Sequence, residues 1–332
     1  MQQVIFTILV SFIVALALGK VIIPLLRRLK AGQQIREDGP QSHLSKAGTP
    51  TMGGIIFIIA LIIGCLIFSR GALDYTIFAL AITVGFTLIG FIDDLIIVVK
   101  KRSLGLKAYQ KIIAQLVLAV IVALFAYTRP ELGSEIYIPF ANIYVDLGWW
   151  YIPFTVFVVL AVVNSVNLTD GLDGLASGVS IIDFATFTLI FIGLFSVAKD
   201  AGDLLGEAHM YNMMIFCGAI TGGVLGFLRF NTYPAKVFMG DTGAFGLGAA
   251  LCVMAITSKM HLMLPIIGFM FMLSSISVIL QVGSYKLRKK RIFKMAPIHH
   301  HFELKGVPET KIVAMYMIIT VILCLIGLLI LN

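Results

Sequence analysis

The stretch Tyr75-Thr-Ile-Phe-Ala-Leu-Ala-Ile-Thr-Val-Gly-Phe-Thr-Leu-Ile-Gly-Phe-Ile-Asp-Asp-Leu-Ile-Ile-Val-Val99 decides the fold class. An apolar run of this length spans a hydrocarbon core of about 30 Å as a helix, because lipid offers no partner to an open backbone. Its charged residues are the adjacent Asp93 and Asp94, close to one end. Unpaired carboxylates near a bilayer are costly, so this pair predicts a cation or a basic partner.

The rest of the chain has the same character. Of its 332 residues, 59% are hydrophobic and 13% are charged, and the mean hydropathy of +1.01 excludes a water-soluble protein. We predict an all-α integral membrane protein, a single transmembrane catalytic domain over residues 1–332, with about ten transmembrane helices. The apolar runs are Gln3–Leu26, Thr51–Ser69, Tyr75–Val99, Ala108–Tyr127, Trp150–Val166, Gly174–Phe195, His209–Leu228, Thr242–Thr257, Leu262–Tyr285 and Ile312–Leu331.

The basic residues predict the orientation of these helices. Of the 25 lysines and arginines, 19 fall in one set of loops, and the opposite loops hold only Arg70, Arg129, Lys199 and Lys259. Loops rich in lysine and arginine stay in the cytoplasm, so both termini are expected outside and the basic loops inside. Most of the net charge of +8 follows from this topology. No stretch is typical of nucleic-acid binding, and we expect no nucleic-acid partner.

Two further segments predict local structure. The outward stretch from Ile136 to Leu147 alternates apolar and polar residues around Asn142, which predicts a small β-hairpin. The ninth run continues to Arg291 and contains Pro265, Ser274-Ser275-Ile276-Ser277 and Gly283, so we expect this helix to kink and open a lateral groove for a lipid. Simple tilt is the alternative. The four cysteines lie in apolar runs at unrelated spacings, which favours buried thiols over a disulfide or a zinc site.

Three inward loops each carry hard oxygen ligands. Besides Asp93-Asp94, the segment Asn164-Ser-Val-Asn-Leu-Thr-Asp-Gly-Leu-Asp-Gly-Leu-Ala176 spaces amides and carboxylates at three-residue steps, and Asp241 follows Phe230-Asn231 and Lys236. Taken singly, Asp241 is better explained as a helix N-cap. Together the loops favour Mg²⁺ beside a diphosphate, and therefore phosphoryl transfer. Candidate phosphate partners are Lys46, Arg102, Lys107 and Lys111.

Two polar features lie outside these loops. Ala296-Pro-Ile-His-His-His-Phe-Glu303 places three histidines side by side in the last inward loop, a spacing that disfavours zinc and favours binding of a phosphate or sugar. Asp183 lies inside a predicted span, and we expect it to be hydrogen-bonded near Ser180 and Thr186. A secondary transporter would instead concentrate its acidic residues near the midplane, so transport is the disfavoured alternative.

Five segments together resemble the polyprenyl-phosphate N-acetylhexosamine-1-phosphate transferases, of the glycosyltransferase 4 type. They are Gly48-Thr-Pro-Thr-Met-Gly-Gly54, Asp93-Asp94, Asn164 to Ala176, Phe238-Met-Gly-Asp241 and Ala296-Pro-Ile-His-His-His301. The resemblance extends from the first inward loop to the last, over nearly the whole chain. Its first and last segments favour the members that use UDP-MurNAc-pentapeptide, and the members that use UDP-N-acetylglucosamine are the alternative.

This resemblance implies transfer of phospho-MurNAc-pentapeptide from UDP-MurNAc-pentapeptide to undecaprenyl phosphate, with release of UMP and formation of lipid I. It also implies a Mg²⁺ cofactor, a homodimer, contact with membrane lipids, and a place in the bacterial cytoplasmic (inner) membrane with the active site facing the cytoplasm. One-step transfer and a covalent aspartyl intermediate are both open.

The resemblance also implies roles for single residues. Asp241 is the expected magnesium ligand, and Asp93 and Asp94 are expected to bind or deprotonate the lipid phosphate and to serve as further metal ligands. Asn167 and Asn231 are expected beside the diphosphate, with Asp173 and Phe238 at the uracil. The remaining substrate-binding candidates are Lys46, Thr51, Lys111, Asp170, His299, His300 and His301, with Lys107 as the alternative to Lys111.

Overall fold

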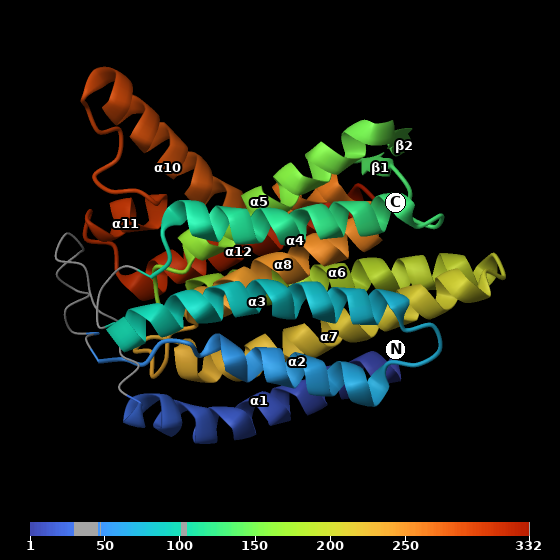
Figure 1. Cartoon of the computed structure of the whole chain (residues 1–332), viewed down its shortest axis with the longest axis horizontal. Helices are drawn as coiled ribbons and strands as arrows, with labels where there is room; N and C mark the ends of the chain where they lie inside the picture. The colour runs from blue at the N-terminus through green and yellow to red at the C-terminus, as the bar shows by residue number, and fades with distance from the viewer. Residues whose placement is uncertain (30–45, 47, 101–104, 332) are drawn as a thin grey trace.

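The computed structural model describes residues 1–29, 46, 48–100 and 105–331, and it is a helical bundle (Figure 1). Among these residues, nine helices are long and apolar enough to cross a membrane, and one shorter apolar helix, α2, accompanies them. The long helices are α1 (Gln2–Arg28), α3 (Asp74–Lys100), α4 (Ala108–Thr128), α5 (Tyr151–Thr169), α6 (Leu175–Asp200), α7 (Leu204–Asn231), α8 (Gly240–Thr257), α10 (Phe269–Arg288) and α12 (Glu309–Leu329). The all-α membrane architecture is confirmed.

Helix α2 (Gly54–Phe68) has 15 residues and is shorter than the predicted run. The residues before it lie outside the helix, with a φ of +70° at Met52, and their backbone pairs with the segment that precedes α8. Gly53 N–H donates to the Phe238 carbonyl at 2.8 Å, and Phe238 N–H donates to the Pro50 carbonyl at 2.8 Å. The Gly-Thr-Pro-Thr-Met-Gly-Gly segment therefore joins the start of α2 to the start of α8.

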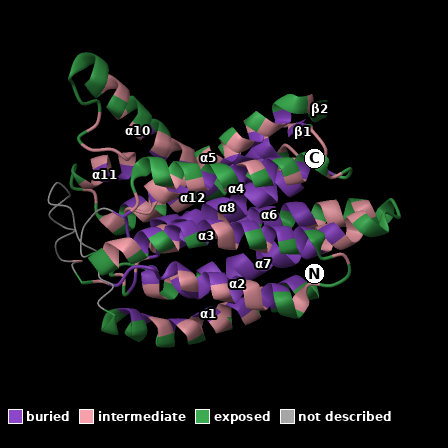
Figure 2. Ribbon diagram, in the orientation of Figure 1, coloured by how far each residue is buried: buried purple, intermediate pink, exposed green. Residues whose placement is uncertain are grey.

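Helices α7 and α8 form the core of the bundle. In their most apolar stretches, 78% of the α7 residues and 89% of the α8 residues are buried, against 22% in α1 and in α10 (Figure 2). Small residues make this possible, because they let helix backbones approach closely. The Cα atoms of Gly54 and Gly243 lie at such a contact between α2 and α8.

The predicted hairpin is confirmed. Strand β1 (Glu135–Ile138) pairs antiparallel with β2 (Ile143–Asp146), with Tyr137 opposite Tyr144. The turn between them has positive φ at Phe140 and at Asn142, a conformation that asparagine tolerates well. The hairpin lies at the same end of the bundle as both termini (Figure 1). The exposed, stacked Trp149 and Trp150 follow it.

The ninth predicted run is broken, as expected of a kinked helix. It comprises a 3₁₀ turn, η3 (His261–Met263), a short helix, α9 (Leu264–Ile267), and α10, which slants away from the bundle (Figure 1). The break lies at Gly268, whose N–H donates to the Leu264 carbonyl at 2.8 Å. Pro265 sits in the first turn of α9, where its missing N–H costs no helix hydrogen bond. A six-residue helix, α11 (Ile298–Glu303), then precedes α12.

Two buried groups within the bundle were also predicted. All four cysteines are buried free thiols, as expected. Asp183 is hydrogen-bonded as predicted, but its partner is not Thr186, which donates to the Ile182 carbonyl one helical turn back at 2.8 Å. The carboxylate of Asp183 accepts from the Cys324 thiol of α12 at 3.6 Å.

Candidate active site

The site begins where the last part of α3 meets the first turn of α8. Gly90 makes this contact possible, because a Cβ at this position would lie 2.0 Å from the Asp241 backbone carbonyl. Gly240, with a φ of +69°, turns the chain into α8, and a Cβ there would lie 2.3 Å from Asp94 Oδ2 and 2.6 Å from Thr51 Oγ1. Two glycines thus bring α3, α8 and the segment before α2 together at one point.

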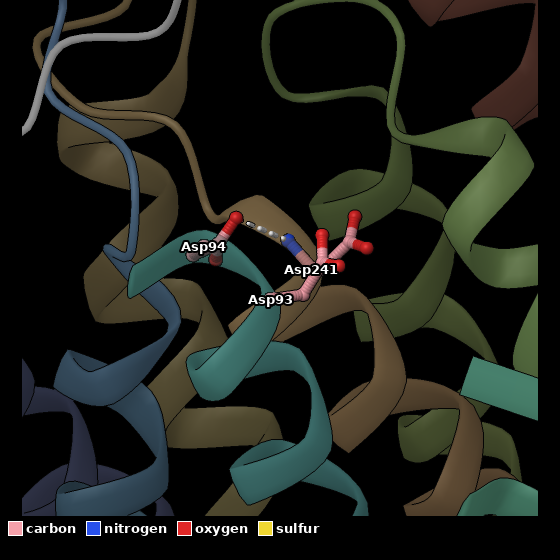
Figure 3. Close-up of side chains that lie close together, drawn as sticks. All are labelled: Asp93, Asp94 and Asp241. Carbon is pink, nitrogen blue, oxygen red and sulfur yellow. Dashed lines mark hydrogen bonds between the residues drawn. The ribbon is translucent and has the colours of Figure 1, made fainter. Parts of the chain in front are cut away.

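Three carboxylates meet at this contact (Figure 3). Asp93, Asp94 and Asp241 each offer an oxygen, and these oxygens all lie within 4.8 Å of one another. Asp93 and Asp94 are 1% and 4% exposed, whereas the Asp241 side chain is 23% exposed and forms the open side of the group. A set of carboxylate oxygens at this spacing suits a hard divalent cation.

Asp94 also holds the start of α8. Its Oδ2 accepts hydrogen bonds from the Thr242 N–H at 3.0 Å and the Thr242 hydroxyl at 2.6 Å, and its Oδ1 accepts from the Asp241 N–H at 3.3 Å. Asp94 therefore accepts from two of the first N–H groups of α8 from a neighbouring helix. The N-cap interpretation of Asp241 is wrong, because that side chain faces other partners.

Those partners are Lys111 and Asn167. The Lys111 ammonium bridges two carboxylates, at 2.8 Å from Asp93 Oδ2 and 2.7 Å from Asp241 Oδ2. Asn167 Nδ2 donates to Asp241 Oδ1 at 2.8 Å. Lys107, the alternative to Lys111, is exposed at the N-cap of α4 and does not share this position. Arg102 lies outside the described residues.

The loop between α5 and α6 carries Asp170 and Asp173. Burial raises the pKa of Asp170 to about 8, and the nearby charges of Asp241 and Asp94 act in the same direction. Asp173 Oδ2 accepts from the Ala235 N–H at 2.9 Å, in the loop between α7 and α8. The charges of Asp241 and Asp94 thus act on this loop, and Asp173 fixes it to the loop between α7 and α8.

A second ion-pair group anchors the same loop. The Lys46 ammonium lies 2.7 Å from Asp173 Oδ1 and 2.7 Å from Glu309 Oε1, at the start of α12. Burial lowers the pKa of Lys46, but the two carboxylates outweigh this effect and the pKa is raised overall. No role was predicted for Glu309 from the sequence. The feature that could have identified Glu309 is its position, as an acidic residue in the last inward loop directly after Pro308 and before the last apolar run.

The three histidines divide into two groups. His299 and His300 are buried against the α5–α6 loop, and a Cβ at Gly171 would lie 2.5 Å from His299 Nε2 and 2.9 Å from His300 Nε2. His300 Nδ1 lies 3.1 Å from Glu303 Oε2. His301 faces elsewhere, and its Nδ1 accepts from the Lys294 N–H at 3.0 Å.

The remaining predicted residues line the loop before α8. Asn231 is 2% exposed, and its side chain accepts from Ser177 Oγ at 2.8 Å and donates to the Val237 carbonyl at 3.0 Å. Both ends of this amide hold protein segments together. Phe238 is half-buried, and its backbone forms the pairing with Pro50 and Gly53 described above.

Comparison with known proteins gives a consistent result. The family described as "Glycosyl transferase family 4" matches residues 76–259, and the "Phospho-N-acetylmuramoyl-pentapeptide-transferase signature 1" matches residues 46–58. A phospho-N-acetylmuramoyl-pentapeptide-transferase of Clostridium novyi (strain NT) is 48% identical over 98% of this chain and 96% of the relative. A protein of the same name from Caldanaerobacter subterraneus subsp. tengcongensis is 49% identical over 97% of this chain and 96% of the relative.

Proposed function

The chain belongs to glycosyl transferase family 4 and, within it, to the phospho-N-acetylmuramoyl-pentapeptide-transferases, and from this premise we propose the reaction of its site. The protein transfers phospho-MurNAc-pentapeptide from UDP-MurNAc-pentapeptide to undecaprenyl phosphate, forming lipid I for peptidoglycan synthesis and releasing UMP. The observation that carries this reading is the group of Asp93, Asp94 and Asp241, bridged by Lys111, at the contact of α3 and α8.

We propose Mg²⁺ as the cofactor, held by Asp241 with Asp93 and Asp94. The donor set fits, because all three ligands are carboxylate oxygens and Asp241 leaves an open side for phosphate oxygens and water. The site also needs a cation, since these carboxylates would repel an anionic diphosphate and Lys111 supplies a single positive charge. When bound, magnesium neutralises charge on the diphosphate and so favours departure of UMP.

The protein residues are proposed to bind and orient the substrates. Lys111 and Asn167 contact Asp241 and face the diphosphate, while Asp173 and Phe238 receive the uracil. The other proposed substrate-binding residues are Lys46, Thr51, Asp170, Asn231, His299, His300 and His301. Asn231 would act through the loop that it holds, because both ends of its amide are engaged.

We propose a one-step transfer. An oxygen of undecaprenyl phosphate forms the new bond to the sugar-bearing phosphorus of the donor, and the bond from this phosphorus to the UMP oxygen breaks. A covalent route would need a carboxylate oxygen free to attack. Asp94 accepts three hydrogen bonds, and Asp93 accepts from the Leu106 N–H at 2.6 Å and pairs with Lys111. These contacts favour binding and positioning roles for both carboxylates over nucleophilic attack.

The proposal extends to the location, orientation and oligomeric state of the enzyme. The apolar helices place the chain in a membrane as a multi-pass protein. We propose the bacterial cytoplasmic membrane, with the basic loops and the active site facing the cytoplasm, one catalytic domain over the whole chain, and a homodimer. Lysine and arginine in the loops beside α10 and α12 suit the anionic inner leaflet.

Release of UMP tests the proposed function. Detergent-purified protein is supplied with UDP-MurNAc-pentapeptide and undecaprenyl phosphate, with and without Mg²⁺, and UMP is measured. We expect release that requires the lipid phosphate and the metal. Turnover with UDP-N-acetylglucosamine in place of the muramoyl donor would overturn the substrate assignment, and no turnover with either donor would overturn the reaction.

The magnesium assignment has its own test in Asp241→Asn. This change removes the charge of the most open ligand, so we expect turnover to fall at least about a hundredfold at limiting Mg²⁺, in line with loss of a preorganised charge. Asp74→Asn is the matched control, because Asp74 lies at the opposite end of α3. Turnover close to wild type in Asp241→Asn would refute the assignment.

A further inference from the structure

Glu309 is a partly buried acid at the proposed site, and the proposed function gives it no role. It is the first residue of α12, and its side chain is 9% exposed. Lys46 donates to both of its carboxylate oxygens, at 2.7 Å and 2.9 Å. The backbone N–H of Asp173 also donates to its Oε1. Such charge-assisted contacts are stronger than neutral hydrogen bonds, and burial keeps them from being screened by solvent.

Through these contacts Glu309 joins segments that are far apart in the sequence. Lys46 belongs to the first inward loop, and Asp173 to the loop between α5 and α6. Asp173 in turn holds the loop before α8 through the Ala235 N–H. One carboxylate therefore fixes the relative positions of three loops from the start of α12.

The α5–α6 loop gives these contacts a functional meaning. One part of it, Gly171, packs against His299 and His300, and Asn167, in the last turn of α5 just before the loop, donates to Asp241 at 2.8 Å. The loop thus lies between the carboxylate group and the histidines, where the UDP donor is proposed to bind. Displacement of the loop would disturb donor contacts, whereas α3, α4 and α8 hold the carboxylates independently.

We propose that Glu309 is a positioning residue of the donor site: it holds Lys46 and the α5–α6 loop in the arrangement that receives the nucleotide diphosphate. This inference rests on the proposed function, because it assigns the donor to that loop. Glu309 acts on affinity for the donor, and it acts on neither the transfer step nor the lipid phosphate.

The test compares three substitutions at Glu309. Glu309→Gln keeps an oxygen to accept the Asp173 N–H but removes the charge that pairs with Lys46, Glu309→Ala removes both contacts, and Glu309→Asp keeps the charge on a shorter side chain. Glu135→Gln is the matched control, because Glu135 also pairs with one lysine, Lys259 at 2.9 Å, in the hairpin at the opposite end. Each full-length protein is purified in detergent, and its thermal midpoint is recorded.

We expect the KM for UDP-MurNAc-pentapeptide to rise about tenfold in Glu309→Ala, less in Glu309→Gln and least in Glu309→Asp, as loss of a charge-assisted contact predicts. We expect kcat within about twofold of wild type and an unchanged KM for undecaprenyl phosphate, as for lost uniform binding. Calorimetric binding of UMP should weaken in the same order, and the control should match wild type.

Other results would overturn the inference. An unchanged KM for the donor in a folded Glu309→Ala protein would do so. A fall in kcat together with equal rises in both KM values, all in proportion to a lower thermal midpoint, would also do so. If Glu309→Ala does not fold, Glu309→Gln and Glu309→Asp decide the question. Failure of the wild-type protein to release UMP would instead refute the proposed function, and UMP binding would then still report on Glu309 independently.

Discussion

At the scale of single residues, Lys111 occupies the position between two proposed metal ligands. Its ammonium bridges Asp93 and Asp241, so a divalent cation must compete with a charge already in place. We expect Lys111→Gln to bind Mn²⁺, a spectroscopic substitute for Mg²⁺, at least about tenfold more tightly, since a nearby like charge costs on the order of 1–4 kcal/mol. Turnover should nevertheless fall, because a phosphate partner is lost.

Electron paramagnetic resonance of free Mn²⁺ measures this affinity without reference to turnover. Lys107→Gln provides the control, because Lys107 lies one helical turn earlier and its side chain is exposed. Weaker Mn²⁺ binding in Lys111→Gln would contradict the expectation.

Asp170 gives the site a pH dependence whose sign can be derived. Burial raises its pKa to about 8 in the folded protein, against about 3.9 in an unfolded chain. The folded state therefore holds this proton more tightly, and its contribution to the free energy of unfolding falls as pH rises from about 4 to about 8. In Asp170→Asn this contribution is absent. Thermal unfolding in detergent at several pH values should show wild type losing more stability than the variant, and parallel curves would exclude the raised pKa.

Sequence reasoning located most residues of the site but not their partners. Asp93, Asp94, Asp241, Lys111 and Asn167 were predicted and lie together. Motif spacing could not distinguish an N-cap from a ligand at Asp241, because the group that caps α8 comes from α3. Glu309 was missed for the same reason, since its contacts join residues more than a hundred positions apart.

At the scale of the elements, the contact between α3 and α8 depends on a missing side chain. A Cβ at Gly90 would meet the rigid backbone carbonyl of Asp241 at 2.0 Å. We expect Gly90→Ala to lower the free energy of unfolding by about 1–3 kcal/mol, as overpacking does. Turnover should fall about a hundredfold, because the carboxylates separate by a fraction of an ångström or more.

Gly193→Ala is the matched control, since Gly193 lies within α6 and a Cβ there has nothing within 4 Å. It should be as stable as wild type or more so, because alanine favours the helix. Thermal midpoints and UMP release measure both effects, and equal behaviour of the two variants would refute the role given to the contact.

Hydrophobic runs predicted the helices better than their ends. The hairpin was expected from the alternation around Asn142, and the break in the ninth run from its length and its proline, serine and glycine residues. The late start of α2 was not, because residues 50–53 pair with the chain before α8, and no local signal reveals that pairing. The sequence left the position of this break open, and it lies at Gly268, since Pro265 is accepted in the first turn of α9.

At the scale of the whole molecule, the orientation can be tested directly. The four native cysteines are buried, so background labelling by a membrane-impermeant maleimide should be low. In intact cells we expect Lys199→Cys to be labelled and Lys305→Cys to be protected until the membrane is permeabilised. Both residues are exposed; Lys199 lies in the last turn of α6, in an outward loop of the predicted topology, whereas Lys305 follows α11 in the last inward loop. The reverse pattern would invert the proposed topology and place the site outside.

Because α8 is buried, the transfer step should depend little on the thickness of the bilayer. This helix carries Asp241, and 89% of the residues in its most apolar stretch are buried by protein. In α10, which faces the lipid, 22% of the residues in the corresponding stretch are buried. Changes in bilayer thickness tilt or strain the outer helices first. In vesicles of short-chain and long-chain phosphatidylcholine, kcat should therefore stay within about twofold while the KM for undecaprenyl phosphate changes. The enzyme would then combine a rigid, buried active site with outer helices that adapt to the bilayer, and its kcat would stay constant when a bacterium changes its lipid composition.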